Sequence, residues 1–293
     1  MSIVVATDFS ANAAAMCALA ANWARRLDLD LVLLHVVADP ELAPALTQDV
    51  HADVQEARQR LDALASGLPA GTRCGVEVRT ADSVAKGILH RLADRVQWAF
   101  LATSNRSLLD RLRLGSVAVA VLRASPVPLV CFPPHATAAV QSAGASSSEP
   151  QHIVLTTDLS ADSRRAFAPT VALARRLGMR ITLVSVLDTL PFVPADPGIV
   201  LAQPSPAKLR SDTTTELARI AREIGPDVCT KTAVVESADA ATAICEFTRS
   251  EAAALLAIAT HGRSGLRRLL LGSVAESVLR SASVPALVFP PAG

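Results

Sequence analysis

The chain has 293 residues, of which 51% are hydrophobic, and its 28 basic and 27 acidic side chains leave a net charge of +1. This length predicts two α/β domains, and the near-neutral charge argues against a nucleic-acid-binding or membrane-surface protein, which usually carries a basic excess. The five cysteines are scattered without metal-ligand spacing, no apolar run could span a bilayer, and no charged leader precedes the first apolar run, so we expect a cytoplasmic protein with reduced thiols.

The strongest large-scale pattern is an internal repeat. The segment IVVATDFS at 3–10 returns as IVLTTDLS at 153–160. Further matches are ARRL at 24–27 and 174–177, LGSVA at 114–118 and 271–275, and FPP at 132–134 and 289–291. The later matches have a larger offset, so the second copy carries a small insertion, which we place in the proline-rich stretch 190–197.

Within each copy, short β-branched apolar runs alternate with helical patterns. The expected strands are 2–7, 31–37, 74–80, 97–102 and 127–132, then 152–157, 180–186, 229–236, 253–259 and 285–289. The expected helices are 11–27, 52–66, 83–95 and 116–124, then 161–177, 207–223, 239–250 and 273–282. This alternation predicts a parallel sheet covered by helices on both faces, with ligands bound beyond the carboxyl ends of the strands.

The segment between the copies, HATAAVQSAGASSSEP at 135–150, has no apolar periodicity and is rich in alanine and serine. Such a composition is typical of a flexible linker, so we expect domains at 1–134 and 151–293. Pro128 and Pro285 fall in the last strand of each copy. Because proline is tolerated at the edge of a sheet and not at its centre, these two strands are predicted to be edge strands.

A glycine-bearing loop, ATHGRSGLRRLLLGS at 259–273, links an apolar strand to a helix in the second copy. The unpaired N–H groups and positive dipole at a helix start can hold a phosphate, and Gly272 would let the backbone approach it closely. Ser273 is predicted to cap the helix, with Glu276 completing a capping box. The loop alone is equally compatible with an ordinary capped turn.

Asp8 and Asp158 each follow the first strand of a copy. Their carboxylates could accept hydrogen bonds from a ligand, or could simply favour the start of the next helix. His35, within LLHVV, is predicted to be a satisfied core or rim histidine. The sequence has no GxxxxGK[ST], GxGxxG or GxSxG motif and no metal-ligand spacing, so we expect no catalytic residues and no metal site.

The two Thr-Asp-(Phe/Leu)-Ser segments, the pair His35-Val36 and the loop Thr-His-Gly-Arg-Ser-Gly with its Leu-Gly-Ser end resemble the universal stress protein family in its tandem form. The resemblance covers both domains and leaves out only the linker. It implies two tandem doubly wound domains, each a five-stranded parallel sheet flanked by helices, as in adenine nucleotide α-hydrolases. It also implies that the two repeats pair through their last strands as an internal pseudo-dimer, while a homodimer of whole chains stays open.

Some members of this family bind ATP and others do not. Carried onto the second copy, the resemblance implies that the nucleotide-binding residues are Asp158, Val186, Ala259, Gly262, Gly272 and Ser273. Asp158 and Val186 would hold adenine and ribose, the loop would wrap the ribose and phosphates, and Ser273 would touch a phosphate. Ala259 stands where the family motif has its first glycine.

The first copy keeps Asp8, Val36, Gly115 and Ser116 as a weaker site. Ala102 and Asn105 replace the first two glycines of its loop, and Val119 stands where a capping box would have glutamate. We therefore expect the first domain to be degenerate for nucleotide binding and to act mainly as the pairing partner of the second domain.

Three functions remain open at this stage. The first is a non-enzymatic stress-response protein whose second domain binds ATP, ADP or AMP, with Mg²⁺ accompanying the phosphates and at most slow hydrolysis. The second is a module that binds no nucleotide and acts through protein contacts. The third, with less support in the sequence, is an adenine-nucleotide hydrolase. Gly262 and Gly272 favour the first function, while Ala259, Ala102 and Asn105 favour the second.

Overall fold

The computed structural model describes residues 1–38, 50–103, 114–134, 136, 151–189, 205–260 and 271–290. The first repeat comprises β1 (Ser2–Ala6), α1 (Ala13–Leu27), β2 (Asp30–Ala38), α2 (Val50–Ser66), β3 (Cys74–Ala81), α3 (Val84–Leu92), β4 (Val96–Ala102), α4 (Ser116–Ala124) and β5 (Leu129–Phe132). The second comprises β6 (His152–Thr156), α6 (Ala161–Arg164), α7 (Phe167–Arg176), β7 (Arg180–Asp188), α8 (Pro206–Ile224), β8 (Cys229–Ser237), α9 (Ala240–Ser250), β9 (Leu255–Ala259), α10 (Ser273–Ser281) and β10 (Ala286–Phe289). All ten expected strands are present, with ends shifted by at most two residues.

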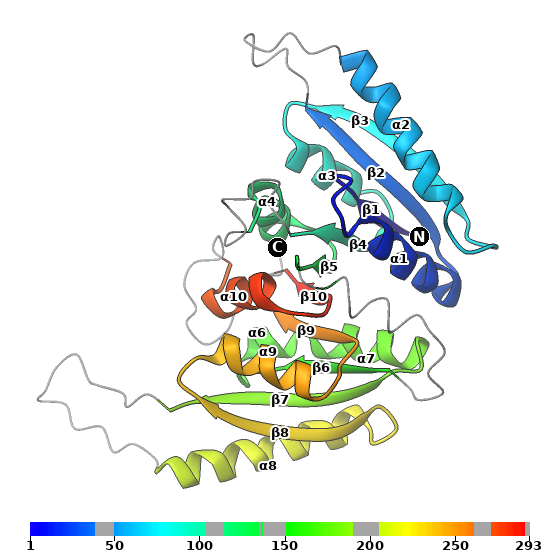
Figure 1. The fold of residues 1–293 in the computed structure, drawn as a ribbon. Helices are drawn as coiled ribbons and strands as arrows, with labels where there is room; N and C mark the ends of the chain where they lie inside the picture. The colour runs from blue at the N-terminus through cyan, green and yellow to red at the C-terminus, as the bar shows by residue number, and fades with distance from the viewer. Residues whose placement is uncertain are drawn as a thin grey trace, which may run out of the picture.

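The two repeats form one continuous ten-stranded sheet in the order β3-β2-β1-β4-β5-β10-β9-β6-β7-β8. Strand pairing is parallel within each repeat, and β5 pairs antiparallel with β10 at the centre, where Val130 lies opposite Leu287. Figure 1 shows this seam between the blue-to-green half and the green-to-red half. Because the seam is antiparallel, the carboxyl ends of the strands lie at opposite edges of the sheet in the two repeats.

Pro128 and Pro285 each lie one residue before a seam strand, and their carbonyls accept hydrogen bonds from Ala99 N (3.1 Å) and Leu256 N (3.0 Å). The prediction that these strands are edges is correct within each repeat. In the whole chain, the two edges cover one another, so the unpaired groups of each seam strand are satisfied by the other repeat.

Helices cover both faces of the sheet, and each face has a core shared by the two repeats. One cluster contains Phe100 with Leu287, and the other contains Val121 with Val278, all four side chains being fully buried. Trp23 packs edge-on to Trp98 with ring centroids 6.0 Å apart in the first cluster. Such shared cores make the two repeats a single packed unit.

The helix expected at 161–177 is divided into α6 and α7 by a turn at Arg165 and Ala166. Pro169 is the third residue of α7. Proline has no N–H to bond the carbonyl four residues earlier and its ring clashes with that carbonyl, so a helix running unbroken through Arg165 is disfavoured.

Candidate functional site

A cavity of about 530 Å³ opens in the first repeat at the carboxyl ends of its strands. Four residues that are far apart in the sequence line it together: Asp8, Val36, Gly115 and Ser116. They are the four that the sequence assigns to the weaker site. They meet because β1 lies between β2 and β4, so the ends of all three strands reach one edge of the sheet.

The turn that carries Asp8 is held by its own side chains. Thr7 Oγ1 accepts a hydrogen bond from Phe9 N (3.0 Å), and Asp8 Oδ1 accepts one from Ser10 N (2.9 Å). Phe9 has a φ of 61°, a left-handed conformation that is uncommon for a non-glycine residue and that these two hydrogen bonds support. The turn therefore sets the direction of the Asp8 carboxylate at the cavity.

Phe9 also forms one wall of the cavity with two residues from other elements. Its ring lies 4.6 Å from the ring of His35 (centroid to centroid), and the Arg60 guanidinium lies 4.1 Å from the Phe9 ring centroid. A cation over an aromatic ring is attracted by the ring quadrupole. His35 Nδ1 donates to Thr7 O (2.7 Å), which confirms that this histidine is hydrogen-bonded.

Gly115, which directly precedes α4, lies against the end of β4. Gly115 N donates to Thr103 O (3.2 Å), and Gly115 is the N-cap of α4 with φ −60° and ψ 142°. The Gly115 amide is thus engaged, and the groups that helix geometry leaves for an anion are the N–H groups of Ser116 and the residues after it.

The second repeat places the corresponding residues at the same points of the fold. Asp158 follows β6, Val186 lies in β7, and Ala259 ends β9. Gly272 N donates to Thr260 O (2.9 Å), as Gly115 does to Thr103. Gly262 and the rest of the loop at 261–270, like Asn105 in the first repeat, fall outside the described residues.

The predicted capping box at Ser273 and Glu276 is wrong. Gly272 is the N-cap of α10, and its extended backbone (φ −61°, ψ 141°) makes Ser273 the first residue inside the helix. A capping side chain must come from the N-cap residue, so the helix start has no side-chain cap. Glu276 N instead donates to Gly272 O at 2.9 Å, as an ordinary first helical bond.

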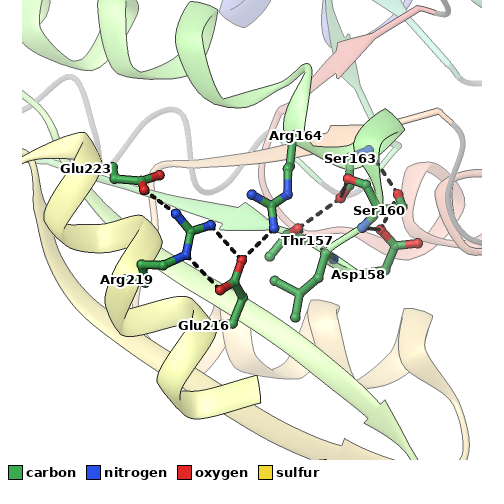
Figure 2. A network of polar contacts seen from close by, with 9 residues as sticks. Thr157, Asp158, Ser160, Ser163, Arg164, Glu216, Arg219 and Glu223 are labelled. Atoms are coloured by element: carbon green, nitrogen blue, oxygen red, sulfur yellow. Dashed lines mark hydrogen bonds and ion pairs between the residues drawn. The ribbon is translucent and has the colours of Figure 1, made fainter. Parts of the chain in front are cut away.

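Asp158 is more tightly tied to its turn than the sequence indicates. Its Oδ1 accepts hydrogen bonds from both the backbone N (3.0 Å) and the hydroxyl (2.6 Å) of Ser160. Figure 2 shows this turn beside Arg164, whose Nη2 donates to Glu216 on α8 (2.6 Å). In the first repeat, the buried Ser10 hydroxyl has no hydrogen-bond partner among the described residues.

The helices over the two sites carry opposite charges at one position. Leu61 of α2 and Leu217 of α8 are both fully buried, and matching them aligns Arg60 with Glu216. Hydrogen bonds from Arg219 and Arg164 lower the pKa of Glu216 to about 2. The second repeat therefore has an ion-pair network where the first has a cation stacked on Phe9.

The contribution of α2 to the cavity was missed from the sequence. Asp53, Glu56 and Arg60 line the cavity, but they resemble an ordinary solvated helix face. Their place on the same helix as the inward-facing Leu61 was the available signal, and it can be interpreted only once α2 is packed over β2 and β3. Among the described residues, no group of acidic, histidine or cysteine side chains could hold a metal ion, and no described helix could cross a membrane.

The family model described as "Universal stress protein family" matches residues 1–133 and 149–290. A universal stress protein of Mycobacterium bovis is 27% identical over 98% of this chain and 96% of its own. One of Methanocaldococcus jannaschii is 32% identical over 46% of this chain and 79% of its own. The crystal structure of a universal stress protein from Archaeoglobus fulgidus, 18% identical, superposes with a TM-score of 0.69 over 98% of this chain and 97% of its own. The repeated turn, the seam and these matches lead to one conclusion: the chain belongs to the universal stress protein family, in its tandem form.

Proposed function

We propose that this tandem universal stress protein binds an adenine nucleotide, ATP, ADP or AMP, with Mg²⁺ accompanying the phosphates. The observation that carries the proposal is the convergence of Asp8, Val36, Gly115 and Ser116 on one cavity of about 530 Å³. A carboxylate, a strand end and a helix start then face a common volume, where they can hold a ribose, a base and a phosphate respectively.

We assign the stronger site to the second repeat. Its corresponding residues are Asp158, Val186, Ala259, Gly272 and Ser273, with Gly262 in the loop. Its start of α10 matches that of α4 in backbone angles and in the glycine-to-threonine hydrogen bond. The first repeat has Asn105 in place of Gly262, so its loop carries a side chain at a position that is glycine in the family motif. The first repeat would then serve as a weaker site and a pairing partner.

Binding rather than catalysis is the expected activity. The family is generally not enzymatic, and neither repeat offers a lysine-bearing phosphate loop. A bound nucleotide would act by stabilising one conformation of the protein over another.

The test is to denature the purified protein, separate the released small molecules by ion exchange, and count adenine nucleotides per chain. Gly115→Val and Gly272→Val are matched variants, because both glycines have extended backbone angles that valine can adopt. We expect about one nucleotide per chain, retained in Gly115→Val and lost in Gly272→Val. Loss in Gly115→Val alone would assign the stronger site to the first repeat and contradict the division of roles.

A protein-interaction module that binds no nucleotide is the second candidate. It is favoured by Ala102, which lines the first cavity, and by Ala259 at the matching strand end, since each methyl group reduces the room for a ribose. Absence of copurified nucleotide, together with no heat on titration of Mg-ATP into the intact chain, would establish this alternative over the first.

A further inference from the structure

Thr103 lies at the junction between the two repeats. It follows the last residue of β4, is 1% exposed, and its carbonyl accepts the hydrogen bond from Gly115 N. Its hydroxyl lies 3.2 Å from Phe132 O in its own repeat and 3.4 Å from Leu279 O in the other repeat. One residue thus contacts the glycine end of the first loop and a helix of the second repeat.

The helix that Thr103 reaches is the one that begins at the second glycine loop. Helix α10 starts after Gly272, and Leu279 lies in its last turn. The last carbonyls of a helix have no partner within it, so the Thr103 hydroxyl acts as a cap from the other repeat. The antiparallel seam explains this contact: the first site lies at the edge of the sheet where α10 ends, and the second site lies at the edge where α10 begins.

The Thr103 hydroxyl has one proton and two acceptors. Both oxygen–oxygen distances are longer than the usual 2.7–2.8 Å for this kind of bond, so the hydroxyl is within reach of both acceptors and can donate fully to only one at a time. A small movement of the β4 end or of α10 can shorten one bond at the expense of the other. Leu114 and Leu271, each next to a loop glycine, belong to the same packed core cluster as Leu279, which spans the seam.

We infer that Thr103 couples the starts of α4 and α10: a change at Gly115 alters the stability of α10 and hence of its start at Gly272. The inference rests on the proposed function only where it concerns nucleotides. The hydroxyl favours Leu279 O in one arrangement and Phe132 O in the other, and a ligand at either loop shifts the balance between them.

The first test needs no ligand. In the intact chain, Thr103→Val removes the hydroxyl with little change of shape, and amide hydrogen exchange is followed in α10. We expect exchange of the Glu276 and Ala282 amides to be about five-fold faster, the effect of losing one hydrogen bond. The matched control is Thr156→Val, because the Thr156 hydroxyl donates within the second repeat, to Ala257 O (3.1 Å). Unchanged exchange in α10 of Thr103→Val would overturn the inference.

The second test measures the coupling itself. The affinity of the second repeat for Mg-ATP is compared in the chain with and without Gly115→Val, by calorimetry. The dissociation constants of the two proteins should differ by about five-fold. The difference should disappear when both proteins also carry Thr103→Val. A difference that persists in Thr103→Val would refute this role of Thr103. If no Mg-ATP binds but α10 exchange still responds to Thr103→Val, the coupling of the two segments stands and the proposed nucleotide function fails.

Discussion

Arg26 and Arg176 each bind the end of the helix that carries the other. Arg26 Nη2 donates to Leu177 O, and Arg176 Nη2 donates to Leu27 O. The two arginines occupy the same place in the repeated ARRL segment. A cation that caps the last carbonyls of a helix is favoured by the helix dipole, so each repeat stabilises the first long helix of its partner across the seam.

Removing either arginine should weaken this contact. Arg26→Ala and Arg176→Ala are each expected to lower the free energy of unfolding by about 1 kcal/mol, because both side chains are solvent-exposed and the bond is charge-assisted. Urea denaturation measures the change. The control is Arg25→Ala at the neighbouring exposed arginine, whose free energy of unfolding should stay within about 0.5 kcal/mol of the native value. An equal loss of stability in Arg25→Ala would contradict a specific contribution of Arg26 and Arg176.

The seam should be sensitive to the volume of its buried side chains. Leu287 is fully buried in β10, opposite Val130 of β5. Truncation by Leu287→Ala should cost about 2–5 kcal/mol, through lost burial and the cavity left behind. Val274, 38% exposed, is the matched position, and Val274→Ala should change the midpoint of thermal unfolding very little. Similar midpoints for the two variants would contradict the shared core.

The acid stability of the protein should depend on Glu216. Its pKa is lowered to about 2 from a usual 4.5 by hydrogen bonds from Arg219 and Arg164. A lowered carboxyl pKa contributes stability above pH 4.5, which is lost as the pH falls toward 2. We expect Glu216→Gln to flatten the fall in stability over this range, as measured by denaturation at several pH values. Glu236→Gln on β8, which loses a surface ion pair with Arg210, serves as the control. An unaltered pH profile in Glu216→Gln would contradict the role of Glu216 in acid stability.

The cysteines should differ in reactivity. Burial raises the pKa of both Cys17 and Cys131 to about 12, while Cys74 is only half-buried. Because the thiolate is the reactive form, a thiol reagent at pH 8 should modify Cys74 first in the native protein, and Cys74→Ser should remove this early phase. The buried thiols ionise more readily once unfolded, so stability should also decline above pH 9. Rapid native labelling of Cys131 would show that its strand is open to solvent.

The strands and their parallel arrangement could be predicted because buried strands leave continuous apolar runs, such as 253–259, that solvent-facing segments do not. The resemblance to the family named Asp8, Val36 and Gly115, and these residues meet because the carboxyl ends of neighbouring parallel strands lie at one edge of the sheet. The helix cap at Gly272 could not be predicted, because it depends on one residue's backbone angles. The part of the cavity wall formed by Arg60 could not be predicted either. In the sequence Arg60 resembles any solvated side chain, and only the packing of α2 on the sheet brings it to the cavity.

The antiparallel seam has an electrostatic consequence. The starts of α4 and α10 lie at opposite edges of the sheet, and the nine residues of α10 alone span about 13 Å. This exceeds the Debye length of about 8 Å at physiological ionic strength. Anions held at the two helix starts would be screened from one another by salt, so any influence of one on the other has to travel through the packed chain, and it should persist as the salt concentration rises.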